Sequence, residues 1–216
     1  MRVRVLILSA AIVLSDQITK LLVKGFSIPL LGISAQGMQY GASKPVIGDF
    51  FRLTHIENPG MAFGIDLGGK WFFSVFSILA SAAILVYLYR AREESLGFRI
   101  SLALILGGAI GNLIDRVFYG VFFSEGPLFH GKVVDFFDVD FFNISVFGYH
   151  LSRWPVFNIA DAAVTIGVFL LLIFHRSTAM EEEPARAEMT TEPVQPLPSE
   201  TISTDNSGRD PASPRP

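Results

Sequence analysis

The sequence contains no cysteine, and this absence excludes several kinds of chemistry at once. Disulfide bonds, thiolate nucleophiles, iron–sulfur clusters and thiolate zinc sites all require that residue. Charged residues are also scarce: they make up 17% of the 216 residues, whereas 50% are hydrophobic and the mean hydropathy is +0.46. A soluble domain of this length rarely averages so apolar. The composition therefore indicates a membrane protein.

Large apolar residues are nearly absent from one region, the C-terminal segment 177–216. This segment is rich in proline, and its three arginines and eight acidic residues give it a net charge of −5. It cannot bury enough apolar surface to offset the loss of chain entropy on folding. We therefore expect a disordered tail at 177–216, following a four-helix membrane domain at 1–176.

Four stretches have the length and the apolarity of a membrane-spanning helix. The first follows Arg2 and Arg4 and could be mistaken for a signal peptide, but no convincing cleavage site follows it and the helical pattern continues through DQITKLLV. The expected fold is therefore an all-α membrane protein with four transmembrane helices, at about residues 3–23, 71–89, 98–119 and 154–174.

The distribution of basic residues predicts how the spans are oriented. The short link between the second and third spans holds Arg90, Arg92 and Arg99, and short basic links stay in the cytoplasm. Both termini are then cytoplasmic, and loops 25–70 and 120–153 lie outside. Each outer loop contains an extended, aromatic-rich run, FFRLTHIENPGMAFGI or GKVVDFFDVDFFNISVFGYHLSRW, which favours small β-rich or amphipathic elements at the membrane surface.

Polar residues of three spans fall at one depth, in the outer half of the bilayer, when 1.5 Å of rise is allowed per residue. A charged group at the bilayer centre costs about 2.5–3.5 kcal/mol, so unrelated charges would not align in depth by accident. We expect these side chains to face one another in a shared polar pocket. They are Asp16 and Lys20 in the first span, Asn112, Asp115 and Arg116 in the third, and Asn158 and Asp161 in the fourth.

Several of these residues also have a purely structural interpretation. Asp16 and Lys20, four residues apart on one helix face, could simply neutralise each other. Asp115 with Arg116 could form a local ion pair or an interfacial anchor. Asp161 differs from these, because no basic residue of its own helix lies within a turn or two. Its partner must come from another element.

Small and amide residues near these charges have structural interpretations as well. Gly107 and Gly111, four residues apart, would let helix backbones approach closely. Asn158 could cap the otherwise unsatisfied amino terminus of the fourth helix.

Five short blocks, in this order along the chain, resemble the signature blocks of type II signal peptidase, the prolipoprotein signal peptidase. That family consists of aspartyl proteases of the bacterial inner membrane. The agreement in order and in the four-span layout makes the resemblance specific, whereas a single pair of aspartates would be weak. The blocks are DQITK (16–20), NPGMAF (58–63), GGAIGNLIDR (107–116), VVDF (133–136) and FNIADAAVTIG (157–167).

The resemblance implies a role for each matching residue. Asp135 and Asp161 become the catalytic pair, and neither a metal ion nor another cofactor is expected. The residues implied to bind substrate are Asn58, Gly60, Asn112, Arg116 and Asn158; those implied to support the site are Asp16, Lys20, Asp115, Gly107, Gly108 and Gly111.

The implied substrates are lipoprotein precursors whose cysteine already carries diacylglycerol, cleaved just before that cysteine. The resemblance further implies a monomer that contacts membrane lipid, binds no nucleic acid, and holds its active site near the outer leaflet. The chain departs from the common family pattern in the longer segment FYGVFFSEGPLFHGKVVDF and the elaborate run DFFDVDFFNISVFGYH. The shape of the outer lip of the site and its substrate preference therefore stay open.

Other function classes remain to be compared with this one. An ion-coupled carrier could use Asp16, Lys20, Asp135 and Asp161 as a proton relay, although the second span is free of charge and no inverted repeat is visible. A serine-type intramembrane protease lacks a GxSG-like motif, and a non-catalytic lipid-binding scaffold would need neither aspartate. A metal-dependent protease lacks HExxH; its ligands would be Asp135, Asp138 and Asp140 with His130 or His150.

Overall fold

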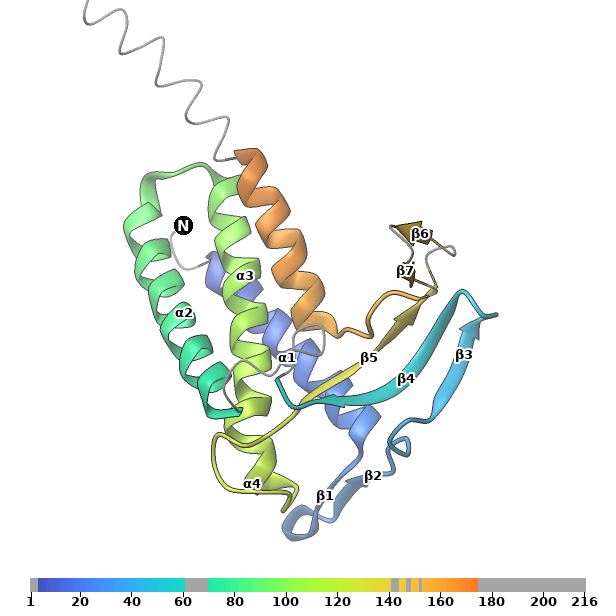
Figure 1. Cartoon of the computed structure of the whole chain (residues 1–216). Coiled ribbons are helices and arrows are strands. Elements are labelled where there is room, and N and C mark those ends of the chain that lie inside the picture. The colour runs from blue at the N-terminus through green and yellow to red at the C-terminus, as the bar shows by residue number, and fades with distance from the viewer. Residues whose placement is uncertain (1–3, 61–69, 141–143, 147–148, 152, 175–216) are drawn as a thin grey trace, which may run out of the picture. The chain divides into compact units, whose positions relative to one another are not determined.

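Four helices run alongside one another in the computed structural model, which describes residues 4–60, 70–140, 144–146, 149–151 and 153–174 (Figure 1). They are α1 (Arg4–Lys24), α2 (Lys70–Arg90), α3 (Leu96–Ile114) and a final helix, Ile159–Phe174. Within the described residues, Arg4–Lys24 and Leu96–Phe122 are long and apolar enough to cross a membrane, and Ser74–Arg90 and Ile159–Phe174 are shorter apolar helices. The short 3-10 turn η2 (Ala91–Glu93) follows α2.

Helix α3 is the central helix, in contact with α1, α2 and the final helix. It begins at Ser95, whose hydroxyl accepts a hydrogen bond from the Phe98 N–H at 3.2 Å. One side of α3 is built from small residues because its neighbours approach there very closely. A Cβ on Gly107 would lie 3.0 Å from the Ser9 carbonyl oxygen of α1. The apolar core between these helices is formed by Val5, Leu88, Ala91, Phe98, Leu102, Ala103 and Leu106.

Helix α3 continues without a break through a π-helical segment, η3 (Asp115–Tyr119), into the short α4 (Gly120–Phe122). The wider π turn leaves Asp115, Val117 and Tyr119 all buried. Segments of this kind are rare and frequently occur at functional sites. Here the segment coincides with the polar layer predicted from the sequence.

The two outer loops meet in a three-stranded antiparallel sheet in the order β3 (Ser43–Ile47), β4 (Phe51–Asn58), β5 (Val133–Val139). Ile56 of β4 lies opposite Asp135 of β5, and Asn58 lies opposite Val133. The sheet therefore joins segments almost eighty positions apart in the chain. Two separate hairpins are formed by β1 (Phe26–Ile28) with β2 (Ile33–Ala35), through the 3-10 turn η1 (Pro29–Leu31), and by β6 (Ile144–Val146) with β7 (Tyr149–Leu151).

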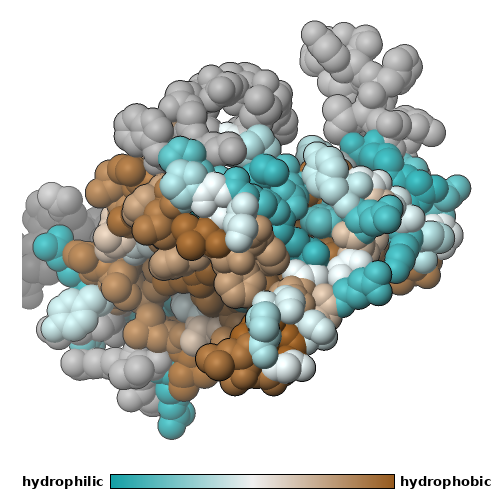
Figure 2. All heavy atoms as spheres, turned by 90° about the horizontal axis from the view of Figure 1, so that it is seen from below, coloured by the Kyte–Doolittle hydropathy of each residue, from teal (hydrophilic) through white to brown (hydrophobic). Residues whose placement is uncertain are grey.

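The described surface separates into apolar and hydrophilic parts. Seen from below, apolar residues gather over the helices and hydrophilic residues over the side of the strands (Figure 2). Exposed apolar side chains on the helices include Ile7, Leu14, Phe76, Leu79, Phe169 and Leu172. Such a helix surface is expected where a protein contacts lipid rather than water.

One predicted boundary is wrong. The fourth helix begins at Ile159 and not at Trp154, because the intervening residues are extended. The Phe157 N–H donates to the Phe137 carbonyl at 3.1 Å, and the Phe137 N–H donates back at 2.7 Å. Pro155 also disfavours helical geometry at the residue before it. Apolarity alone could not distinguish this extended segment from another turn of helix.

The strands also make the description "all-α" too narrow, since a three-stranded sheet carries part of the polar layer. Residues 61–63 of the NPGMAF block and the tail 177–216 lie outside the described residues.

Candidate active site

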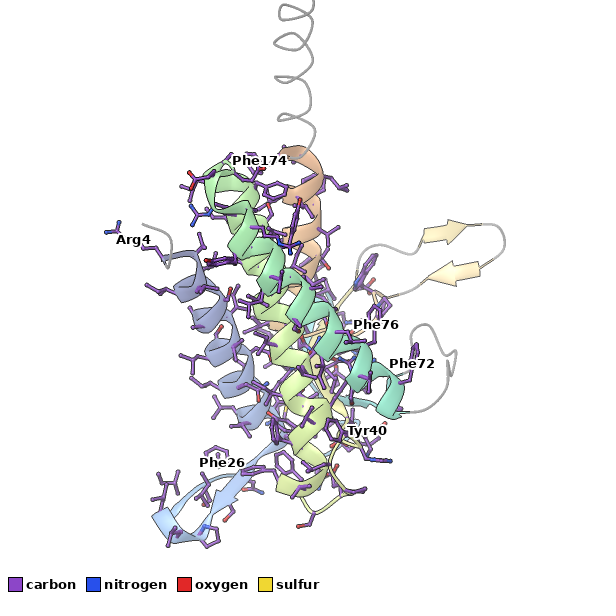
Figure 3. The ribbon with its side chains drawn as sticks, turned by 90° about the vertical axis from the view of Figure 1, so that its left-hand side faces the viewer. Arg4, Phe26, Tyr40, Phe72, Phe76 and Phe174 are labelled. Carbon is purple, nitrogen blue, oxygen red and sulfur yellow. The ribbon has the colours of Figure 1, made fainter. Side chains whose placement is uncertain are left out.

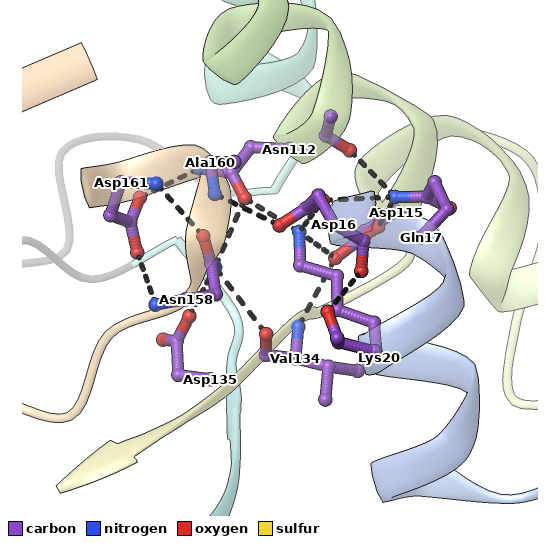
Figure 4. A network of polar contacts seen from close by, with 12 residues as sticks. Asp16, Gln17, Lys20, Asn112, Asp115, Val134, Asp135, Asn158, Ala160 and Asp161 are labelled. Atoms are coloured by element: carbon purple, nitrogen blue, oxygen red, sulfur yellow. Dashed lines mark hydrogen bonds and ion pairs between the residues drawn. The ribbon is translucent and has the colours of Figure 1, made fainter. Parts of the chain in front are cut away.

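Lys20 lies at the centre of a buried polar cluster between α1 and α3 (Figure 4). Its Nζ lies 2.8 Å from a carboxylate oxygen of Asp16 and 2.8 Å from one of Asp115, and it donates to Asn112 Oδ1 at 2.8 Å. Lys20, Asp16 and Asp115 have no exposed side-chain surface. Three acceptors match the three donors of an ammonium group, so this buried charge is fully compensated.

This arrangement decides between the interpretations that the sequence left open. The expected pairing of Asp16 with Lys20 is present. Asp115, in contrast, pairs with Lys20 of α1, and among the described ion pairs it has none with its neighbour Arg116. The π segment turns Asp115 inward, and its second oxygen accepts from Gln17 Nε2 at 2.8 Å.

The carboxylates of the cluster also hold backbone groups of two other elements. Asp115 Oδ2 accepts from the Val134 N–H of β5 at 3.2 Å. Asp16 Oδ1 accepts from the Ala160 N–H, in the first turn of the final helix, at 2.9 Å. An anion at a helix amino terminus satisfies an orphan donor and interacts favourably with the helix dipole. The cluster therefore ties α1, α3, β5 and the final helix together.

Asn112 connects this cluster to Asp161. Its Oδ1 faces the Lys20 ammonium, which can only donate, so its Nδ2 must point the other way. That Nδ2 donates to Asp161 Oδ1 at 2.7 Å. Asn112 is thus the partner from another element that Asp161 was expected to need. A Cβ on the nearby Gly111 would lie 2.8 Å from an oxygen of Asp16, so glycine leaves room for that carboxylate beside α3.

Asn158 joins the two aspartates of the predicted pair. Its side-chain Nδ2 donates to Asp135 Oδ1 at 2.6 Å, and its Oδ1 accepts from the Asp161 N–H at 2.9 Å. The Asp161 carboxylate in turn accepts from the Asn158 N–H at 3.3 Å. This reciprocal pattern is a capping box, with Asn158 at the N-cap and Asp161 three residues later. The expected helix cap at Asn158 is confirmed, and it also positions Asp161 beside Asp135.

Asp135 lies on β5 and is 4% exposed. Burial, followed by the negative charge of Asp161, raises the pKa of this carboxyl to about 7, against the opposing effects of Lys20 and the Asn158 hydrogen bond. A carboxyl whose pKa is raised in this way beside a second carboxyl can hold a proton near neutral pH.

The remaining predicted residues lie at the edge of this network. Asn58 ends β4, on the same sheet face as Asp135, and its Oδ1 accepts from the Gly60 N–H at 2.9 Å. Gly60 has a φ of 105°, which favours glycine. Arg116 lies 3.4 Å from Ser77 Oγ, and its buried Nε has no hydrogen-bond partner among the described residues. Arg116 is close enough to Asp161 and Asp135 to interact with both electrostatically.

The model of the family described as signal peptidase (SPase) II matches residues 8–176. The chain belongs to the signal peptidase II family.

Curated members of this family are similar over most of the chain. A lipoprotein signal peptidase of Porphyromonas gingivalis is 39% identical over 181 residues, which cover 70% of this chain and 80% of that protein. One of Chlorobium phaeobacteroides is 42% identical over 130 residues, covering 60% and 75%. One of Chlorobium luteolum is 32% identical over 179 residues, covering 83% and 95%.

Two solved structures are also similar to this chain. A bacterial membrane enzyme determined at 1.9 Å is 31% identical, with a TM-score of 0.59 over 79% of this chain and 90% of that one. Another, determined at 2.3 Å, is 30% identical, with a TM-score of 0.57 over 89% and 94%. The protein is therefore a peptidase with a membrane-enzyme fold, which removes the carrier and the non-catalytic scaffold as alternatives.

The metal-dependent alternative is not supported by the positions of its ligands. Asp138 accepts from Arg153 Nε and from Thr54, each at 2.6 Å, on the strand face opposite to Asp135. Asp140 lies 3.5 Å from Arg153, and His130 is exposed. Among the described residues no group of three potential metal ligands is brought together. The side chain of His150 lies outside them.

Sequence reasoning missed two members of the network. Gln17 Nε2 donates to Asp16, to Asp115 and to the Gly111 carbonyl, at 3.2, 2.8 and 3.1 Å. Tyr119 donates its hydroxyl to Gln17 Oε1 at 3.1 Å. Gln17 lies within the DQITK block, and that position was a signal. A neutral amide beside charged residues, however, does not by itself indicate a member of a buried network. Tyr119 carries no signal, since the π segment alone turns it inward.

Proposed function

We propose that the chain is an aspartyl endopeptidase that removes the signal peptide from diacylglyceryl-modified prolipoproteins, cutting just before the lipidated cysteine. The observation that carries this proposal is that one amide side chain, Asn158, contacts Asp135 and also caps the turn that holds Asp161. Membership in the signal peptidase II family supports the substrate class, because its relatives are lipoprotein signal peptidases.

The two carboxyls supply the chemistry of direct hydrolysis. The ionised member takes a proton from water as that water attacks the scissile carbonyl carbon, and the protonated member donates its proton to the carbonyl oxygen. When the tetrahedral diol collapses, the carboxyl that gained the proton delivers it to the departing amide nitrogen. The other carboxylate takes a proton from a hydroxyl of the diol, which restores the starting state of the pair. No acyl-enzyme forms, so the absence of cysteine and of an activated serine is no obstacle. We assign the shared proton to the pair Asp135 and Asp161 as a unit.

The neighbouring groups suit a substrate that is partly lipid. Asn58, Gly60, Asn112, Arg116 and Asn158 are the proposed substrate-binding residues. Amide side chains can bind a peptide backbone or a developing oxyanion without adding charge. Arg116, whose Nε has no partner among the described residues, is able to bind a carbonyl or headgroup oxygen of the substrate. Asp16, Lys20, Asp115, Gly107, Gly108 and Gly111 form the proposed support beneath the site.

The same proposal includes a location and a topology. Four transmembrane helices place both termini in the cytoplasm and the catalytic pair near the outer leaflet of the bacterial inner membrane. From its number of residues and the helical rise, the final helix is about 24 Å long, so it starts below the outer membrane surface. At that depth the acyl chains of the substrate can stay in lipid while its peptide bond reaches the aspartates. The peptidase domain comprises residues 1–176, the tail is a solvated extension, and the enzyme acts as a monomer without a cofactor.

Cleavage of a diacylglyceryl-modified prolipoprotein by the purified full chain in detergent, with excess chelator, tests the proposal. Asp135→Asn and Asp161→Asn should each reduce turnover by several orders of magnitude, while substrate binding is retained and both variants still fold. Asp138→Asn is the matched control, because it removes a carboxylate from the same strand that pairs with Arg153 instead. It should retain turnover within a few-fold.

Each result has a distinct meaning for the proposal. Wild-type turnover by either variant of the pair would exclude the two-carboxylate mechanism. Loss of wild-type activity on chelation, with recovery on adding a divalent metal, would favour the metal-dependent mechanism. Equal activity on a precursor without the diacylglyceryl group would contradict the proposed substrate class.

A further inference from the structure

The hairpin at residues 26–35 carries the most exposed large apolar side chain among the described residues. Leu30 is 94% exposed, Leu31 is 64% exposed, and Ile33 beside them is 51% exposed. The whole run from residue 25 to residue 43 contains no charged side chain. An apolar and uncharged tip is unusual for a loop that faces water.

The base of this hairpin is fixed to α1, so its direction is defined. The Gly25 N–H donates to the Leu21 carbonyl at 2.8 Å, and the Met38 N–H donates to the Val23 carbonyl at 2.7 Å. Gly25 and Gly37 approach so closely that a Cβ on either would overlap backbone atoms of the other segment. The turn closes at Gly32, where a φ of 65° allows its N–H to donate to Pro29. The tip is therefore held at a set angle to the helix.

The tip has no protein cover among the described residues. Strands β1 and β2 are only three residues long, and within the described chain they form a sheet with each other alone. A single two-stranded hairpin is marginally stable in water at best, and it needs a further surface to pack against. The exposed leucines indicate that this surface is apolar.

The bilayer is the apolar surface that the rest of the molecule places nearby. Helix α1 exposes a stripe of Ile7, Leu14, Ile18 and Leu22, which are 55–64% exposed and share one helix face. In a membrane enzyme this stripe contacts lipid, and the hairpin follows it directly after Gly25. Figure 3 shows the hairpin, with Phe26 at its base, leaving the lower end of α1 and projecting away from α2 and α3.

We propose that residues 26–35 form an interfacial membrane anchor, with Leu30 and Leu31 inserted into the leaflet that the carboxyl end of α1 reaches. Short apolar elements of this kind typically bury themselves about 5–10 Å into the boundary between headgroups and acyl chains. The neighbouring β3–β4 hairpin differs in charge: its exposed apolar residues, Val46, Ile47 and Phe50, alternate with the exposed charged residues Lys44 and Asp49. The anchor fixes α1 to the membrane at a second point, and α1 carries Asp16 and Lys20 beneath the site. This inference is independent of the catalytic mechanism proposed above.

Site-directed fluorescence tests the anchor, and the absence of native cysteine makes the labelling simple. Leu30→Cys and Leu31→Cys are each labelled with an environment-sensitive fluorophore in the full chain and reconstituted, one copy per disc, into phosphatidylcholine nanodiscs. Lys44→Cys on the β3 strand is the matched control. Quenching is measured with nitroxide attached high on the lipid acyl chain, and separately with aqueous iodide.

Both leucine positions should be quenched several-fold more by the nitroxide lipid than the Lys44 position, and several-fold less by iodide. Equal iodide quenching at all three positions would overturn the proposal. Protection that appears only with two copies per disc would also overturn it, because the tip would then contact a second copy of the chain. The labelled variants should cleave substrate at wild-type rates, which verifies their folding.

Discussion

Asn158 shows how much one side chain contributes at the residue scale. It donates to Asp135, accepts from the Asp161 backbone and donates to Asn112, so both polar atoms of its side chain contact the site. An aspartate there would add a third negative charge, and an apolar residue would leave buried groups unpaired. An amide supplies donors and an acceptor without charge, which leaves the pair of carboxyls to set the protonation state.

Two substitutions at Asn158 separate its roles. Asn158→Ser keeps an N-cap oxygen but loses the amide donor to Asp135, so turnover should fall about 10²–10³-fold, as for loss of one positioned donor in other hydrolytic sites. Asn158→Ala should lose the same activity and also about 0.5–2 kcal/mol of stability, because the helix cap disappears. Turnover and thermal unfolding of both variants are the measurements. Equal instability of the two would show that the cap is not made by the side chain.

The raised pKa of Asp135 predicts a pH-dependent stability. Its folded-state pKa of about 7 lies above the ordinary value of 3.8, so the folded protein binds more protons than the unfolded chain between these values. The stability that this group contributes is fully present below about pH 4 and is lost as the pH rises through 7. Asp135→Asn cannot ionise and should therefore unfold at a higher temperature than wild type at pH 8.

Thermal unfolding in detergent across this pH range measures the effect. The difference between Asp135→Asn and wild type should shrink as the pH falls from 8 to 5. Asp138→Asn serves as the control with the opposite sign: the pKa of Asp138 is lowered because hydrogen bonds from Thr54 and Arg153 outweigh its burial. A constant difference across the range would contradict the assignment to Asp135.

At the scale of elements, the first turn of the final helix decides where Asp161 lies. This turn rests against α3 at Gly108, where a Cβ would overlap the Ala160 carbonyl oxygen. Asp16 holds the Ala160 N–H from the other side. The helix start is thus fixed by a close backbone contact and by a carboxylate of a different helix, and neither is visible in the FNIAD block itself.

Gly108→Ala should push this turn away from α3. We expect a loss of about 1–3 kcal/mol of stability, the usual cost of overpacking a tight contact. Turnover should fall by a larger factor than stability explains, because Asp161 moves with the turn. Gly126→Ala is the control, since its added Cβ would meet only His130 Cβ at an ordinary 3.6 Å. Thermal unfolding and turnover of the folded fraction distinguish the two; unchanged activity in Gly108→Ala would refute the coupling.

At the scale of the whole described unit, two ionic clusters join segments that are distant in the chain. One is centred on Lys20; the other is centred on Glu57 of β4, which pairs with Lys24 of α1 and lies 2.9 Å from Lys132 before β5. Lys24 also lies 2.6 Å from Glu125, in the loop that follows α4. The contact with His55 and these lysines lower the pKa of Glu57 despite its burial.

Removal of the Glu57 charge tests this second cluster. Glu57→Gln leaves the buried Lys24 with one anionic partner fewer, so we expect a loss of about 1–3 kcal/mol at neutral pH. A lowered pKa stabilises the fold above the unfolded value of 4.5 and loses that effect as the pH falls below it, so the difference should diminish under acid conditions. Denaturant unfolding at pH 7 and pH 4 measures it. Asp49→Asn, which removes an exposed ion pair with Arg52, should change stability little at either pH.

The sequence by itself determined the membrane class, the approximate helices, the layer of polar residues and, through five ordered blocks, most residues of the polar network. These properties are local, because apolarity, helical spacing and depth are all read along one segment. Only the tertiary structure decided that Asp115 pairs with Lys20, that Asn112 reaches Asp161 and that Asn158 contacts Asp135. Those pairings depend on the rotation of each helix about its axis and on the register of β4 with β5. Both are set by packing between segments many residues apart, for which a linear pattern carries no signal.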